Sequence, residues 1–196
     1  MDEKISLIVN SLGKEKFKLN EPVAYYSALK LGGKAKLFTV AFTESELIKV
    51  VKLCRQLKVP YFIFGSGTKM VISDQGFEGV VIQNRTRNIE VVSIKGKVSK
   101  IGIGVEQASV TIESGVSITK LIEFIDKQGL SSQEFNGIPG TVGGNIFINR
   151  LLQERTKSIK VYTQDDEIEE IDVKSISLSK HVILSVVLNI KAKQPF

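Results

Sequence analysis

Residues 43–70, "TESELIKVVKLCRQLKVPYFIFGSGTKM", join a predicted helix, a predicted strand and a glycine-rich loop. Thr43 and Glu46 have the spacing of a capping box, and an apolar stripe at helical spacing follows them. The stripe consists of Leu47, Val50, Val51, Cys54 and Leu57. Pro60 ends the helical segment, and "YFIF" is a short apolar run typical of a buried strand. Because the strand "KLFTV" is predicted just before the helix, the stretch predicts a right-handed βαβ unit with a parallel strand pair.

The loop "GSGTKM", residues 65–70, follows the second of these strands directly. Glycine permits positive φ and carries no Cβ, so neighbouring N–H groups can face one anion. Ser66 and Thr68 add hydroxyl donors, and Lys69 adds a positive charge. The loop has neither the Gly-Lys-Ser/Thr triplet of a Walker A loop nor the third glycine of the dinucleotide fingerprint. Both a plain turn and a phosphate cradle therefore stay open for this loop.

A second glycine-rich stretch, "NGIPGTVGG", occupies residues 136–144, where we expect neither a stable helix nor a strand. Pro139 fixes its own φ and pushes Ile138 towards an extended conformation. The bare backbone has two explanations: a ligand lies against it, or the segment crosses another backbone at close range. Together with the loop at 65–70 and the pair Gly32 and Gly33, it favours a large phosphorylated cofactor reached from several sides.

The remaining pattern predicts an α+β protein with two lobes. Residues 2–12 predict a helix with Gly13 as its left-handed cap, and residues 14–34 are expected to be irregular. Further strands are predicted at "EGVVIQN", within residues 88–112 and within residues 157–191. Ser117 can cap a second helix that Gly129 stops. We expect a βαβ lobe over residues 1–83 and a strand-rich lobe over residues 84–196.

Composition excludes several classes of site. A single cysteine, Cys54, rules out an internal disulfide, and on its apolar stripe it is expected to be a core residue. One histidine, His181, leaves no room for a histidine metal cluster or a conventional Ser-His-Asp triad. The net charge of +6 comes from scattered lysines, which argues against a nucleic-acid surface.

Targeting signals are equally scarce in the sequence. No apolar run approaches the roughly 20 residues that a membrane helix needs. The start, "MDEKISLIVN", has acidic residues where a secretory signal has basic ones. We therefore predict a cytoplasmic protein with no membrane partner.

Three ordered segments resemble the MurB family, the UDP-N-acetylenolpyruvoylglucosamine reductases. They are "LKLGGKAKLFTV", "VPYFIFGSGTKMVISDQGFEGVVIQN" and "SGVSITKLIEFIDKQGLSSQEFNGIPGTVGGNIFIN". The resemblance covers residues 28–149 well and "VILSVVLNIKAK" near the end. It implies a two-lobed FAD-binding fold of the vanillyl-alcohol-oxidase type, non-covalent FAD, and NADPH as the electron donor for peptidoglycan precursor synthesis. His181 falls outside the matching loops, which also favours a non-covalent cofactor.

The resemblance also implies which residues contact FAD. The loop at 65–70 would wrap the diphosphate, with Thr68 and Lys69 where the family usually has Ser-Asn, and Asn84 would lie near the adenine. The full expected set is Gly32, Gly33, Phe64, Gly65, Ser66, Gly67, Thr68, Lys69, Met70, Asn84, Gly115, Val116, Ile138, Pro139, Gly140, Thr141, Gly143 and Gly144. No catalytic residue and no metal ligand is assigned.

Three departures from the family fall on its chemistry. "NRLLQERTKS" (149–158) stands where the family has a Gly-Ala-Tyr-Gly turn, and "VKSISLSKH" (173–181) stands where it has a Tyr-Arg-x-Ser motif. The sequence stops at Phe196, where the family's substrate domain would begin. We therefore expect a shortened member of the family, a flavoprotein that lacks the usual reductase activity and has a redox, sensing or assembly role. Two alternatives are a working flavin-dependent oxidoreductase, the NADPH-dependent reductase of this family completed by a partner subunit, and a cofactor-free remnant that binds protein. A homodimer is a further expectation, because it would cover an exposed flavin face.

Overall fold

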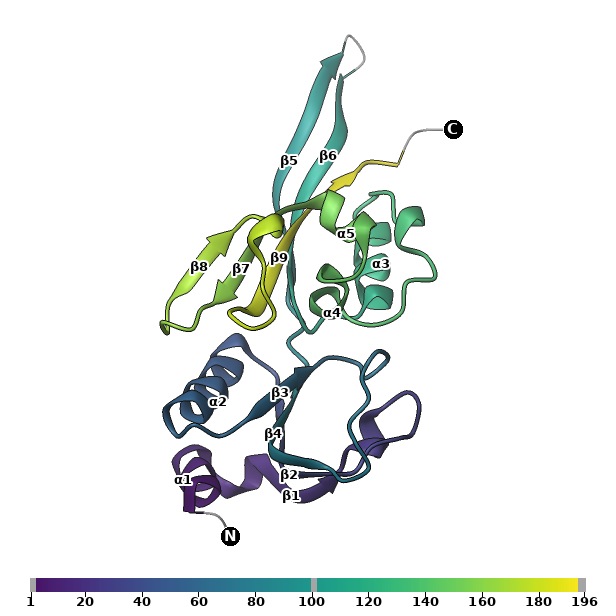
Figure 1. Ribbon diagram of the computed structural model, residues 1–196. Helices are drawn as coiled ribbons and strands as arrows, with labels where there is room; N and C mark the ends of the chain where they lie inside the picture. Colours follow the sequence, from purple (N-terminus) through teal and green to yellow (C-terminus); the bar gives the residue numbers. More distant parts are fainter. Residues whose placement is uncertain (1–2, 100–101, 194–196) are drawn as a thin grey trace. The chain divides into compact units, whose positions relative to one another are not determined.

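A computed structural model describes the backbone of residues 3–99 and 102–193, and the chain divides into two compact units after Thr86 (Figure 1). The sequence pattern places a division after residue 83 and gives both lobes a share in FAD binding. That functional assignment of the two lobes stays a prediction. Each unit is described by itself below.

Unit 1 is a four-stranded sheet with two α-helices. Its elements are α1 (Glu3–Leu12), η1 (Lys14–Lys16), β1 (Phe17–Pro22), η2 (Val23–Tyr26), β2 (Lys34–Ala41), α2 (Glu44–Gln56), β3 (Tyr61–Phe64) and β4 (Phe77–Asn84). The strand order is β1-β2-β4-β3, with β4 parallel to both of its neighbours and β1 antiparallel at the edge. The α+β class is confirmed.

Two expectations for unit 1 need correction. The strands that flank α2 are parallel, but they do not pair with each other because β4 lies between them. Six successive residues of β4 are buried, so it gains most from the position with a neighbour on each side. Residues 14–34 are not wholly irregular, since they contain β1, an edge strand with three exposed residues in its middle that alternation could not reveal.

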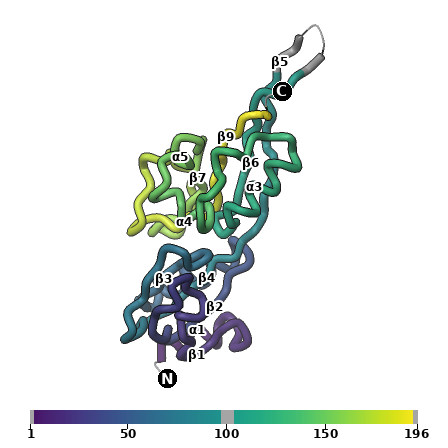
Figure 2. Tube along the Cα trace, turned by 90° about the vertical axis from the view of Figure 1, so that its right-hand side faces the viewer, coloured from purple at the N-terminus to yellow at the C-terminus, as the bar shows by residue number. Residues whose placement is uncertain are grey.

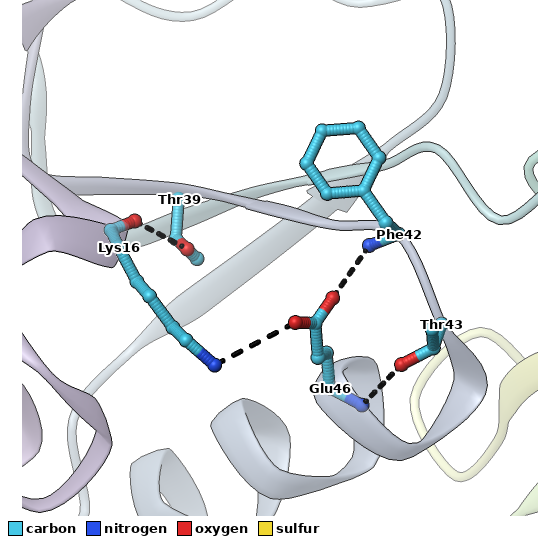
Figure 3. A network of polar contacts seen from close by, with 5 residues as sticks. All are labelled: Lys16, Thr39, Phe42, Thr43 and Glu46. Carbon is cyan, nitrogen blue, oxygen red and sulfur yellow. Dashed lines mark hydrogen bonds and ion pairs between the residues drawn. The ribbon is translucent and has the colours of Figure 1, made fainter.

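The start of α2 is tied to the sheet by a small polar network, which Figure 3 shows. The Thr43 hydroxyl accepts from the Glu46 N–H at 3.2 Å, as the predicted cap requires. The Glu46 carboxylate accepts from the N–H of Phe42 at 2.9 Å, one residue earlier than in a standard capping box. It also faces Lys16 Nζ at 3.6 Å, while the Lys16 carbonyl accepts from the Thr39 hydroxyl at 2.9 Å.

The apolar stripe of α2 is buried as predicted, apart from Leu57, which caps the helix and is half-buried. Burial raises the pKa of the Cys54 thiol to about 12, so this cysteine is an inert core residue, as expected. Gly13 follows α1 with a φ of 98°, but its ψ of 126° lies outside the left-handed helical region that we expected.

Unit 2 is an antiparallel sheet covered by helices. Its elements are β5 (Ile89–Ser99), β6 (Gly102–Glu113), α3 (Ile118–Lys127), η3 (Gln133–Phe135), α4 (Val142–Ile146), α5 (Arg150–Arg155), β7 (Thr156–Tyr162), β8 (Ile168–Ile171), η4 (Val173–Ser175) and β9 (Val182–Lys191). The strand order is β5-β6-β9-β7-β8. In Figures 1 and 2 the hairpin of β5 and β6 continues past the part of β6 that pairs with β9.

The core of unit 2 lies between the sheet and its helices. Leu121 and Ile125 of α3 pack with Val110, Ile112 and Leu188 of the sheet, and all five are fully buried. Five fully buried aliphatic side chains of this size contribute roughly 1.5–3 kcal/mol each. The helix starts at Ser117, whose hydroxyl accepts from the Lys120 N–H, and ends before Gly129, as predicted.

Candidate functional site

The first glycine bend, residues 65–70, lies between β3 and β4 and has alternating exposure. Phe64 and Met70 are buried at its two ends and belong to the same apolar cluster. Ser66, Thr68 and Lys69 are exposed, and the two hydroxyl oxygens lie 3.4 Å apart. The backbone N–H groups of Ser66, Gly67 and Thr68 donate to no acceptor in the part of the chain that the structure describes. The bend therefore offers backbone donors at two exposed residues, Ser66 and Thr68, and a third donor at the buried Gly67.

Gly67 is required by the protein's own backbone. Its φ is +72°, and an added Cβ would lie 2.0 Å from the carbonyl oxygen of Tyr26. The Gly67 carbonyl accepts from the Ala28 N–H at 3.0 Å, so the bend is hydrogen-bonded to the segment 26–28. No ligand is needed to explain the missing side chain at this position.

Gly32 and Gly33 have the same kind of explanation. A Cβ on Gly33 would lie 2.4 Å from the carbonyl oxygen of Asp74, and the Gly33 N–H donates to Ser73 at 3.0 Å. Gly32 has a φ of +130° and lies beside Ile72. The pair thus holds the segment that leads from the first bend to β4.

The end of β4 supports the first bend from below. Gln83 donates from its Nε2 to the Gly65 carbonyl at 3.3 Å, which fixes the first residue of the loop. Sequence reasoning missed Gln83, although a polar residue in an otherwise apolar strand was a visible signal. Asn84, the predicted adenine neighbour, is buried, and its Oδ1 accepts from the Thr86 N–H at 3.1 Å.

The second glycine bend, residues 136–144, runs beside residues 114–118. The N–H groups of Val142 and Gly143 donate to the carbonyls of Val116 and Ser114 at 2.8 and 2.9 Å. The Ile118 N–H returns a bond to the Gly140 carbonyl at 3.0 Å. The structure therefore brings together the two predicted segments of unit 2. The expectation of no helix here was wrong, because α4 begins at Val142 with Thr141 as its cap.

Some glycines of this bend are explained by a close backbone crossing, and others leave room for a ligand. A Cβ on Gly143 would lie 2.7 Å from the Ser114 Cβ, so Gly143 is needed for a close backbone crossing. Gly140 has a φ of +104°, which only glycine adopts readily. Gly144 differs, since it is exposed and its nearest neighbour would be the Thr141 hydroxyl at 3.4 Å. Gly144 is thus a glycine of this bend whose bare face remains open to a ligand, and Gly137, with nothing within 4 Å of an added Cβ, is another.

Asn145 holds the second bend in shape, and sequence reasoning missed it. Its side chain is fully buried, and Nδ2 donates to the carbonyls of Pro139 and Thr141 at 2.9 Å each. Ile138 is half-buried and Pro139 is exposed, so the start of the bend stays on the surface. An asparagine directly after a glycine pair was the available signal.

The region "VKSISLSKH" forms a local turn. The hydroxyl oxygens of Ser177 and Ser179 lie 3.1 Å apart, and His181 Nδ1 accepts from the Ser177 N–H at 3.2 Å. Among residues 3–99 and 102–193, no cluster of three His, Cys, Asp or Glu side chains could hold a metal ion. Over the same ranges, no helix combines the length and hydropathy of a membrane span.

Comparison with known proteins shows which family this chain resembles. The curated UDP-N-acetylenolpyruvoylglucosamine reductase of Alkaliphilus metalliredigens is 31% identical over 173 residues, which are 85% of this chain and 53% of that protein. The chain thus spans about half the length of the curated relatives it matches. The resemblance to the MurB reductases is confirmed over most of the chain.

Solved structures show the same fold. The MurB reductase of Thermus caldophilus superimposes with a TM-score of 0.59 at 19% identity, covering 90% of this chain and 60% of that one. A VAO-type flavoprotein of Myceliophthora thermophila C1 gives a TM-score of 0.67 at 10% identity, covering 98% and 47%. The expected fold of the vanillyl-alcohol-oxidase and MurB type is therefore confirmed.

A family model described as an FAD binding domain matches residues 35–164, a span that contains both glycine bends. FAD is the cofactor that this match assigns, in agreement with the sequence expectation. The chain belongs to the FAD binding domain family.

Proposed function

We propose that the chain holds FAD non-covalently through its two glycine bends and functions as a MurB-like flavoprotein. The observation that carries the proposal is that the family match spans both bends. The predicted contact set, from Gly32 to Gly144, is part of this proposal. So are the assignment of one FAD-binding lobe to each unit and a cytoplasmic location.

The residues of the first bend suit an FAD diphosphate. Ser66, Gly67 and Thr68 supply backbone N–H donors, Ser66 and Thr68 add hydroxyls, and Lys69 adds positive charge on the exposed side. In unit 2, the open and exposed face of Gly144 suits a flat ring system. When bound, FAD supplies the electron-transfer chemistry, and the chain supplies binding and orientation.

We propose further that this chain alone does not reduce the enolpyruvyl sugar nucleotide. Residues 156–196 contain no arginine, so they offer no guanidinium to stabilise a developing negative charge. The Ser177 and Ser179 hydroxyls lie together in a local turn, and His181 accepts a bond from the same turn. A redox, sensing or assembly role is the function that remains.

A second candidate is a working NADPH-dependent reductase that a partner subunit completes. It is favoured by the span of the chain, which is 53% of the Alkaliphilus metalliredigens reductase. The proposed assembly is either a homodimer or a complex with a partner subunit that carries the substrate-binding part.

Spectroscopy of the purified protein tests these proposals. The protein should be yellow, or it should take up added FAD with a rise in melting temperature. Bleaching by NADPH, with consumption of the enolpyruvyl substrate by the chain alone, would favour the reductase. Bleaching by chemical reductants alone supports a flavin holder, and failure to take up FAD would refute the proposal.

A further inference from the structure

Ser27 carries a buried hydroxyl that has no hydrogen-bond partner among the residues that the structure describes. The residue is 2% exposed and lies just after η2, in the segment 26–28 that contacts the first bend. Its only such counterpart in the described chain is Ser158 of β7. A buried hydroxyl without a partner costs roughly 1–3 kcal/mol, so the residue needs an explanation.

The surroundings of Ser27 point to the first bend. Its Cα would lie 3.3 Å from a Cβ on Gly67, and the next residue, Ala28, donates to the Gly67 carbonyl at 3.0 Å. On the other side, Tyr26 stacks on Phe38 with ring centroids 4.2 Å apart. The backbone of Ser27 is therefore held against Gly67, in the loop whose N–H groups donate to no acceptor among the described residues.

We propose that Ser27 is an FAD-binding residue whose hydroxyl donates to an oxygen of the bound cofactor at the first bend. This inference rests on the proposed FAD binding. The hydroxyl is enclosed in the present arrangement, so the exposed residues of the bend, Ser66, Thr68 and Lys69, shift when the cofactor enters. Binding then provides the partner that the hydroxyl lacks.

The test compares two effects of removing the Ser27 hydroxyl, which should not lower the stability of the FAD-free protein but should weaken FAD binding. Ser27→Ala removes an unsatisfied group, so the melting temperature of the FAD-free protein should stay the same or rise. The same change should weaken FAD binding about tenfold, because a hydrogen bond to a charged acceptor is lost. Ser27→Cys keeps the side-chain volume but is a weak donor, so it should also weaken binding. FAD dissociation constants from flavin fluorescence titration give the measurement.

Ser158→Ala is the matched control, because it removes the other unsatisfied buried hydroxyl. It should leave FAD affinity within twofold of the wild type. Hydrogen exchange at residues 66–69 should change when FAD is added to the wild type. A loss of stability in FAD-free Ser27→Ala would mean that the hydroxyl already has a protein partner, and the proposal would fail. It would fail alone if Ser27→Ala bound FAD like the wild type, whereas a wild type that takes up no FAD would overturn the proposed function with it.

Discussion

The two glycine bends look alike in sequence but differ in what their backbone touches. The second bend is joined to residues 114–118 by three backbone hydrogen bonds and continues into α4. The first bend is anchored at Gly67 and Gly65, while Ser66, Thr68 and Lys69 stay exposed. A glycine can therefore mark contact with the chain itself or with a ligand, and the space around its absent Cβ separates the two cases.

The largest expected effect is at the anchor of the first bend. Gly67→Ala should lower the free energy of unfolding by about 3 to 5 kcal/mol, because left-handed strain adds to a clash with the Tyr26 carbonyl. Urea denaturation followed by circular dichroism measures the loss. Gly137→Ala is the control, since its φ is +77° but nothing lies within 4 Å of the added Cβ. That variant should lose only about 1 kcal/mol, and equal losses at both sites would show that the Tyr26 contact is unimportant.

Asn145 should have the largest effect in the second bend outside its glycines. Asn145→Ala removes the side-chain donor to the Pro139 carbonyl and one of the two donors to the Thr141 carbonyl, so we expect a loss of about 1 to 3 kcal/mol. The matched control is Asn136→Ala, at an exposed asparagine of the same bend, which should leave the stability unchanged. Equal urea midpoints for the two variants would rule out this role for the asparagine.

The adjacent glycines of the second bend should respond in opposite ways. Gly143→Ala forces apart the crossing at Ser114 and should cost about 1 to 3 kcal/mol of stability. Gly144→Ala has room for its Cβ within α4, so stability should hold or rise by up to about 1 kcal/mol. If FAD lies against Gly144, the methyl group should weaken FAD binding at least tenfold, measured by fluorescence titration. Unchanged affinity in Gly144→Ala would remove Gly144 from the cofactor site.

Sequence reasoning reached the elements with strong local signals. The caps at Thr43 and Ser117 and the apolar stripe of α2 were confirmed. These features depend on residues close together in the sequence, within a single helix. Strand order could not be read, since the position of β4 between β2 and β3 depends on contacts distant in the chain. The missed β1 is an edge strand, whose residues are exposed or half-buried and show no buried alternation.

The candidate site was predictable in outline but not in its reasons. The motifs located both bends, yet only the fold shows that Gly33, Gly67 and Gly143 face backbone of the same chain. Gln83 and Asn145 went unnoticed because a single sequence does not reveal which carbonyl a distant amide reaches. Side chains that shape a loop are thus harder to find than the loop itself.

The smallest expected effect concerns the acid stability of the segment that anchors the first bend. The Tyr26 hydroxyl donates to Glu21 at 2.6 Å and, with Lys18 at 3.1 Å, holds the pKa of that carboxyl below its usual range. A lowered folded-state pKa stabilises the fold above the unfolded value and loses that contribution as the pH falls through the folded value. Tyr26→Phe should therefore lose slightly less stability than the wild type between pH 7 and pH 3, measured by urea denaturation at each pH. Tyr25→Phe, at the exposed neighbouring residue, should behave like the wild type. An identical acid response in all three proteins would show that the Tyr26–Glu21 bond does not stabilise the fold, which would leave the stacking on Phe38 and the Gly67 contact as the anchors of the first bend.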